Sequence, residues 1–108
     1  MKLREWTELF LKHRNLHRKD MAKLEETARG FQLHTTEGRV QIVVVEDELH
    51  PQDAADADII IFLNRRENAK KLAQHWNAFI ARNILMISAN PETNQKWQIK
   101  TQVHDKVA

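Results

Sequence analysis

Two short segments without a polar residue constrain the fold of this chain most. The stretches Ile59–Leu63 and Ile84–Ile87 are wholly apolar, and a strand without a polar face is buried on both sides of its sheet. Apolar residues recur at helical spacing between the two stretches, over residues 65–83, and predict a helix. Strand, helix and strand in this order form a right-handed crossover with parallel strands. The sheet therefore needs a covering layer on each face.

The predicted helix over residues 65–83 has a capping signal and a predicted buried face. Asn64 is expected to accept a hydrogen bond from the first turn, and Glu67 completes the capping pattern three residues later. Trp76 lies at the centre of the apolar stripe, so we predict that it is a core residue. The whole stripe consists of Ala69, Leu72, Ala73, Trp76, Phe79 and Ile80.

The N-terminal part of the chain must supply the second covering layer. Residues 2–14 show the amphipathic spacing of a helix. Residues 18–29 allow two interpretations. Asp20 can cap a second helix that ends at Gly30, or alternate residues can form a poor strand. We favour the second helix.

Three further strands complete the predicted sheet. Residues 31–35 and 39–45 alternate around a turn that contains glycine, which is typical of a β-hairpin. Residues 97–101 alternate as an edge strand. We therefore predict a single α/β domain over residues 1–108, a small three-layer α/β/α sandwich on a mixed sheet of about five strands. Its expected order is α-(α)-β-β-β-α-β-β, where the bracket marks the uncertain second helix.

This order is similar to the core of the restriction-endonuclease-like fold. The resemblance is one of topology, and it implies a carboxylate on the second core strand and an acid-x-lysine triplet on the third, which hold a divalent metal and activate water. Here the second predicted strand ends in Glu46-Asp47-Glu48. The third, from Asp58 to Leu63, contains no acid-x-lysine triplet.

The composition excludes several classes of protein. The chain has no cysteine, which excludes disulfides, thiolate metal sites and a cysteine nucleophile. Its apolar runs are too short to span a membrane, so we expect no membrane partner. Charged residues stand at positions 2, 4 and 5, where a signal peptide would be apolar. We therefore expect a soluble cytoplasmic protein.

Charge is distributed unevenly, although the net charge is only +2. Residues 46–58 carry six acidic residues and no lysine or arginine. The basic residues on either side include two clusters, and an uneven pattern of this kind suggests an anionic partner or an intramolecular contact. The first cluster consists of Lys12, Arg14, Arg18 and Lys19, and the second of Arg65 and Arg66.

Polar side chains also gather at the expected carboxyl edge of the parallel strands, where open α/β sheets bind ligands. The arginines of the second cluster stand at a helix start, whose free N–H groups favour an anion. We predict a site for an anion or a nucleic-acid phosphate at this edge. Its residues are Asn64, Arg65, Arg66, Ser88 and Asn90.

Three hypotheses for function follow from these patterns. The first is a non-enzymatic binding module that uses the basic surface to bind nucleic acid or another anionic ligand. The second is a protein-interaction domain or a homodimer, formed through the edge strand 97–101 or the acidic loop 46–58. The third is a metal-dependent nuclease with an atypical site, built from Glu46 or Asp47 with Asp58 and a distant lysine.

We favour the first hypothesis and predict no catalytic residue, no cofactor and no metal site. His13 and His17 have a spacing that can chelate a transition metal. Four cationic neighbours surround them and oppose a dication, so we interpret both as exposed histidines.

Overall fold

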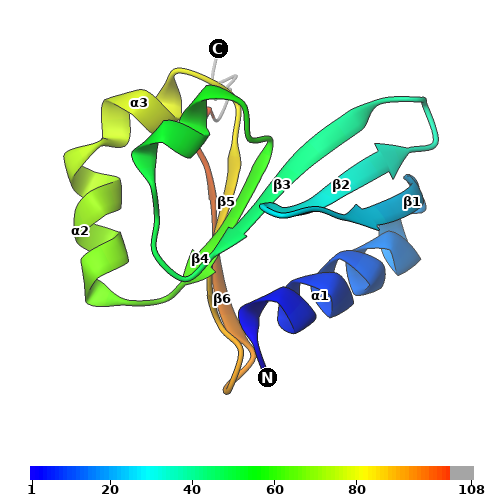
Figure 1. The fold of residues 1–108 in the computed structure, drawn as a ribbon, viewed down its shortest axis with the longest axis horizontal. Helices are drawn as coiled ribbons and strands as arrows, with labels where there is room; N and C mark the ends of the chain where they lie inside the picture. Colours follow the sequence, from blue (N-terminus) through cyan, green and yellow to red (C-terminus); the bar gives the residue numbers. More distant parts are fainter. Residues whose placement is uncertain (103–108) are drawn as a thin grey trace, which may run out of the picture.

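A computed structural model describes residues 1–102 and shows a mixed sheet of six strands with three α-helices (Figure 1). The helices in this part of the chain are too short or too polar to cross a bilayer. The elements are, in chain order, α1 (Leu3–Arg18), β1 (Met21–Glu26), β2 (Gly30–Thr35), β3 (Val40–Glu46), the 3₁₀ helix η1 (Pro51–Ala55), β4 (Ile59–Leu63), α2 (Arg66–Gln74), α3 (Trp76–Ile80), β5 (Leu85–Asn90) and β6 (Gln95–Lys100).

The strands lie in the sheet in the same order as in the sequence, from β1 to β6. The central strands β3, β4 and β5 are parallel, whereas β1, β2 and β6 each pair antiparallel with their neighbours. Ile61 pairs with Val45 on one side and with Ile87 on the other. The predicted parallel crossover between the two apolar segments is therefore confirmed, and the sheet has six strands rather than about five.

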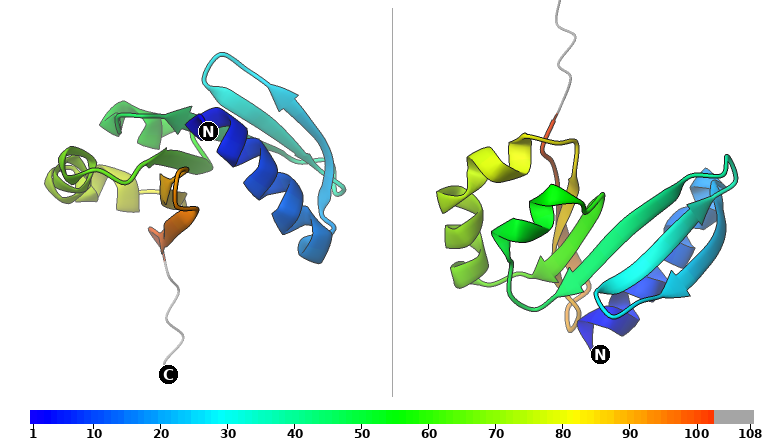
Figure 2. Two further views of the ribbon diagram at one scale, coloured as in Figure 1. Left: turned by 90° about the horizontal axis from the view of Figure 1, so that it is seen from below. Right: turned by 45° about the horizontal axis from the view of Figure 1, so that its top comes forward.

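A separate hydrophobic core lies on each face of the sheet. On one face, α1 packs Trp6 and Leu11 against strand residues such as Ile61. On the other face, Phe79 of α3 packs with Ile60 and with residues of the η1 region. Figure 2 shows α1 on one side of the sheet and η1, α2 and α3 on the other. The requirement for a covering layer on each face is thus met.

The second helix expected over residues 18–29 is wrong. Helix α1 continues to Arg18 and ends at Lys19, whose φ of 52° is left-handed. The chain then forms β1, which pairs antiparallel with β2, and Leu24 packs towards the α1 core. Residues 21–29 consist mostly of good helix formers such as alanine, leucine, lysine and glutamate. The ladder hydrogen bonds and the burial that β2 offers nevertheless outweigh this local preference.

Arg4 of α1 connects the helix to the turn between β1 and β2 by hydrogen bonds. Its guanidinium donates hydrogen bonds to the carbonyl oxygens of Thr27 at 2.8 Å, Ala28 at 3.1 Å and Gly30 at 3.0 Å. The same group lies 5.7 Å from the ring centroid of Phe31. Arg4 is therefore occupied by structural contacts, and we do not count it among the groups free to bind a ligand.

The single helix expected over residues 65–83 is wrong in its length and in its buried face. It breaks at His75 into α2 and α3. The break changes the direction of the helix, so Phe79 is fully buried while Trp76 is 37% exposed. Ala69 is exposed as well, and Asn68 is the buried residue of α2 instead.

Asn64 does not cap α2, contrary to the sequence prediction. The residue at the N-cap is Arg65, and no side chain caps the helix. Asn68, one turn further on, has the connecting role. Its side-chain oxygen accepts a hydrogen bond from the Leu49 N–H at 2.9 Å, and its amide donates to the carbonyl oxygens of Asp47 and Leu63, both at 2.7 Å.

We expect the Asn68→Ala variant to lose about 2–4 kcal/mol of unfolding free energy, because three backbone groups lose their partner in a buried region. Urea denaturation followed by circular dichroism measures this loss. The matched change Asn64→Ala should alter stability by no more than about 0.5 kcal/mol, as at an ordinary exposed position. An equal loss in both variants would contradict the conclusion that Asn68 connects three backbone groups and that Asn64 does not cap α2.

A candidate ligand cleft and groove

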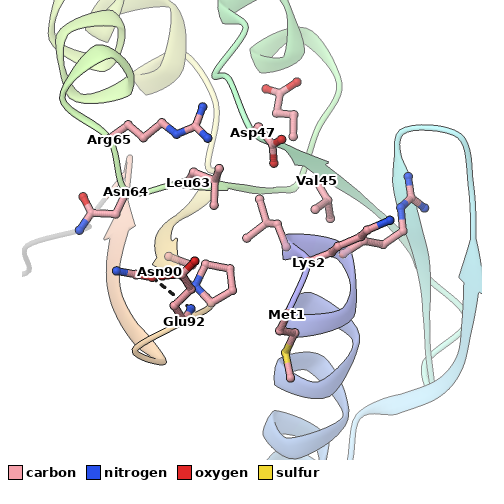
Figure 3. Close-up of a pocket in the computed structure, with 14 residues that line it drawn as sticks. Met1, Lys2, Val45, Asp47, Leu63, Asn64, Arg65, Asn90 and Glu92 are labelled. Carbon is pink, nitrogen blue, oxygen red and sulfur yellow. Dashed lines mark hydrogen bonds between the residues drawn. The ribbon is translucent and has the colours of Figure 1, made fainter.

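A cleft of about 720 Å³ lies at the carboxyl edge of β3, β4 and β5, beside the first residues of α1 (Figure 3). The parallel register of the three strands brings the segments that follow them to this edge. The Asn64 N–H donates to the Ala89 carbonyl at 2.8 Å, which holds the β4 and β5 ends together. The charged and amide side chains that line the cleft include Lys2, Asp47, Asn64, Arg65, Asn90 and Glu92.

The structure brings together some of the residues predicted for this edge and not others. Asn64, Arg65 and Asn90 all line the cleft. Ser88 is buried inside the sheet, paired with Phe62 and Trp97. Arg66 is exposed in the first turn of α2 and does not line the cleft.

The N-terminal basic cluster lies at the other end of α1. Lys12, Arg14 and Arg18 belong to its second half, and Lys19 follows its last turn. A helix of this length extends about 22 Å, so the two basic clusters do not form one compact patch. Lys12 pairs with Glu8 at 3.4 Å and Arg18 with Asp20 at 3.3 Å, both on the exposed surface.

A groove of about 670 Å³ runs along α1 beside the cleft. Met1 and Pro91 line both depressions, so the two adjoin at these residues. The groove is lined by apolar and basic residues together. Its lining includes Leu9, Phe10, Lys12, His13, Leu16 and Lys96.

Phe10 is one of two aromatic residues that line this groove, together with Trp6. Its ring stacks on Trp6 with the centroids 5.2 Å apart, and the Lys96 ammonium lies 5.6 Å from its centroid. The Trp6 indole donates a hydrogen bond to the Asn94 side chain at 2.8 Å, which joins α1 to the β5–β6 turn. Contacts between two distant parts of the chain therefore fix the position of these groove residues.

Basic residues outside both clusters pair with four of the six acidic residues of the acidic loop. Arg29 pairs with Asp53 at 3.0 Å and with Asp56 at 2.6 Å, while Arg82 lies 3.5 Å from Asp58. Lys71 lies 3.7 Å from Glu48. Among residues 1–102, Arg65 and Arg66 have no carboxylate within 4 Å, so the alternative that they pair with the acidic loop within one chain is not observed.

The surfaces named for a homodimer remain predictions. Strand β6, which contains the predicted segment 97–101 except for its last residue, forms one edge of the sheet. Trp97 in this strand is 61% exposed. The acidic loop 46–58 is largely paired within the chain, which weakens the charge that it could offer to a second copy.

Glu46 at the end of β3 is the most perturbed carboxyl group in the described part of the chain. One of its oxygens accepts a hydrogen bond from the His50 backbone N–H at 3.0 Å, and the other shares a hydrogen bond of 2.8 Å with the His50 ring Nδ1. Burial and the neighbouring Asp53 carboxylate raise the pKa of Glu46 to about 7. Glu46 therefore holds a proton at a pH where an exposed glutamate has lost it.

This raised pKa predicts how stability changes with pH. A carboxyl whose pKa is higher in the folded state than its ordinary 4.5 contributes stability at low pH, and that contribution disappears as the pH rises towards 7. His50 and Asp53 face Glu46, and Arg29 pairs with Asp53. We expect the unfolding free energy of the wild type, relative to Glu46→Gln, to decrease between pH 4.5 and pH 8. Parallel stability curves for the two proteins would contradict this.

The residues of the nuclease hypothesis are not brought together. Because β1 is a strand, the second and third strands are β2 and β3. Strand β2 contains no carboxylate, and the sequence after β3, Glu46-Asp47-Glu48, contains no lysine. Asp58 lies at the opposite end of β4, where it accepts a hydrogen bond from the Ile42 N–H at 2.8 Å. The site expected from Glu46 or Asp47 with Asp58 does not form.

Comparisons with family models, with curated proteins and with solved structures find no match to this chain. Function must therefore be argued from the cleft and the groove. Lys2 lines the cleft and Lys96 lines the groove, and the sequence prediction missed both. They belong to segments far apart in the chain, so no local pattern brings them to the same region.

Proposed function

We propose that this chain is a non-enzymatic binding domain for single-stranded nucleic acid, with weak sequence preference. The strand would lie in the cleft and continue along the α1 groove. The observation that supports this path is that the two depressions adjoin at Met1 and Pro91. It extends from Arg65 at the carboxyl edge of the sheet to Lys12 in the second half of α1.

Basic side chains along this path supply partners for phosphates. Arg65 and Lys2 line the cleft, and Lys96 and Lys12 line the groove. Within residues 1–102, only Lys12 of these four has a carboxylate within 4 Å, and that pair is exposed. Phosphate contacts of this kind provide affinity and salt dependence without reading the sequence.

The apolar residues of the groove favour a single strand over a duplex. Leu9 is 55% exposed, and Leu9 and Phe10 both line the groove. Unpaired bases can stack on such a surface, whereas the bases of a duplex are enclosed. Asp47 and Glu92 in the cleft offset part of the positive charge. We therefore expect a dissociation constant on the order of 10⁻⁴–10⁻⁶ M at physiological salt.

Fluorescence anisotropy with a labelled 12-nucleotide oligothymidylate and the matching oligouridylate tests this proposal. The double variant Lys12→Glu/Lys96→Glu should bind at least about 10-fold more weakly at 50 mM salt, because both lysines line the groove. The matched variant Lys70→Glu/Lys100→Glu changes net charge equally at exposed positions outside both depressions. Equal loss in both variants, or no binding by the wild type at 50 mM salt, would overturn the proposal.

Arg65 and Arg66 are neighbours at the start of α2, and comparing their variants tests whether Arg65 alone contacts a phosphate. We expect Arg65→Gln to reduce the slope of log affinity against log salt by about 0.7, the contribution of one phosphate in a single strand. Arg66→Gln should leave the slope unchanged, because Arg66 does not line the cleft. Both variants should keep the unfolding free energy of the wild type. A slope that falls equally in the two variants would contradict the assignment of Arg65 to the path.

A further inference from the structure

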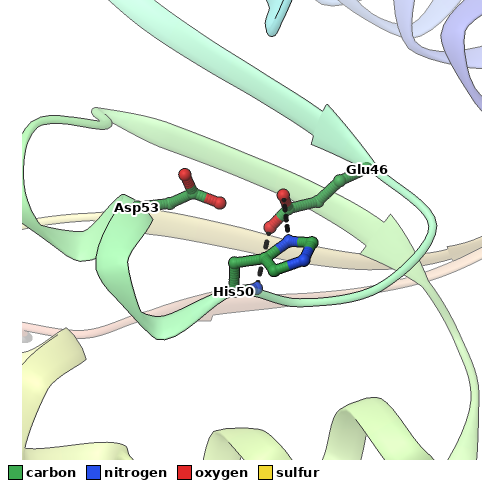
Figure 4. A group of neighbouring side chains, drawn as sticks. All are labelled: Glu46, His50 and Asp53. Carbon is green, nitrogen blue, oxygen red and sulfur yellow. Dashed lines mark hydrogen bonds and ion pairs between the residues drawn. The ribbon is translucent and has the colours of Figure 1, made fainter.

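Three potential metal ligands lie close together between the end of β3 and η1. Only one of them, Glu46, also lines the cleft of the proposed binding path. Glu46 ends β3, His50 follows in the loop, and Asp53 lies in η1 (Figure 4). One ligand atom from each of the three residues lies within 4.8 Å of the others. Zinc bonds to nitrogen and oxygen are about 2.0–2.2 Å long, which places the ligand atoms of a tetrahedral site about 3.3–3.6 Å apart. The widest separation in this cluster would therefore have to shorten by about 1.5 Å at most.

The Asp53 carboxylate contributes a buried oxygen that a cation would satisfy. Asp53 is only 8% exposed, and its Oδ1 is held by the Arg29 guanidinium at 3.0 Å. Its Oδ2 is buried and has no hydrogen-bond partner among residues 1–102. Buried polar atoms are almost always paired. In Figure 4 this carboxylate faces Glu46. The carboxyl proton of Glu46 can satisfy the unpaired oxygen, and a cation between the two groups would take the place of that proton.

The donor set indicates which cation would fit. One imidazole nitrogen and two carboxylate oxygens suit Zn²⁺, whereas Mg²⁺ and Ca²⁺ prefer oxygen ligands alone. Arg29 holds Asp53 through Oδ1 and leaves Oδ2 directed at the cluster. Three protein ligands would leave a fourth coordination position open to water or to a ligand.

We propose that Glu46, His50 and Asp53 form a binding site for one Zn²⁺ ion. This inference is independent of nucleic-acid binding. Zinc would take the place of the hydrogen that now links the His50 ring to Glu46. The site would tie the end of β3 to η1, so zinc binding should also raise the thermal stability of the domain.

Isothermal titration calorimetry of the purified protein with zinc chloride at pH 7.5 tests the site. We expect one Zn²⁺ per chain and no comparable binding of magnesium chloride. The variant His50→Asn should bind zinc at least about 100-fold more weakly, because loss of a ligand costs no less than loss of a residue that only orients one. The His50 side chain is 46% exposed, so this change leaves the core intact, and circular dichroism verifies the fold.

The other histidine pair of the chain serves as a matched control. His13 and His17 lie one turn apart on α1 with their ring centroids separated by 5.7 Å. The double variant His13→Asn/His17→Asn should bind zinc as the wild type does. Loss of zinc binding in that variant would assign the metal to α1 instead. Wild-type affinity in His50→Asn, or no zinc binding by the wild type, would also overturn the proposal.

Discussion

Replacing Gly30 with alanine is expected to prevent stable folding of this domain. Gly30 begins β2 and packs against the backbone of β3, opposite Val44. A Cβ atom at this position would overlap the Val43 carbonyl oxygen and would lie 2.9 Å from the Val45 nitrogen. Both obstacles are backbone atoms of a buried strand, which cannot move aside without disrupting the sheet. We expect a loss of at least about 3 kcal/mol of unfolding free energy.

Gly38 provides the control for this prediction. It also has a positive φ, +87°, but a Cβ there would meet no atom within 4 Å. Gly38→Ala should therefore cost only about 1–2 kcal/mol, the ordinary penalty of a left-handed conformation. Thermal and urea unfolding of both variants distinguishes the two effects. A Gly30→Ala protein as stable as Gly38→Ala would show that β2 and β3 are not packed as described.

Phe79→Ala is expected to cost about 3–5 kcal/mol, whereas Trp76→Ala should cost about 1 kcal/mol or less. Phe79 is fully buried in the core under α3, and Trp76 is 37% exposed beside the break at His75. Two aromatic residues only three positions apart thus differ in their contribution to stability. Urea denaturation midpoints for the two variants measure this difference. The reverse order would show that residues 66–80 form one continuous helix.

The fold could be predicted from the sequence where one pattern dominates. Ile59–Leu63 and Ile84–Ile87 have no polar residue, and they became the buried centre of the sheet. Residues 18–29 have no dominant period. Whether they form a helix or a strand depends on β2, which offers an unpaired edge. Pairing with a neighbouring strand is a tertiary effect that local propensity does not contain.

The candidate site could be predicted only in part. The carboxyl ends of parallel strands meet at one edge, so Asn64, Arg65 and Asn90 could be placed near one another from topology alone. Lys2 and Lys96 join this region because α1 crosses the sheet beside the β5–β6 turn. That crossing depends on contacts such as Trp6 with Asn94, which have no signature in the linear sequence.

The start of α2 could be located from the sequence, but the contacts of its side chains could not. Asn64 and Glu67 show a capping pattern, yet the chain enters α2 from a buried strand and Arg65 takes the N-cap position. Asn68 was absent from the predicted stripe because it is polar. Its burial follows from three backbone groups of the β3–η1 loop and of β4 that need a partner at that point.

The path proposed for nucleic acid is tested most directly by an NMR titration of the ¹⁵N-labelled protein with unlabelled 12-nucleotide oligothymidylate at 50 mM salt. We predict that amide shifts concentrate in three segments, residues 64–66, 90–96 and 9–13, which line the cleft and the groove or adjoin their lining residues. The amides of β1 and α3 should stay unchanged. An unchanged spectrum, or shifts confined to β1 and α3, would contradict the account.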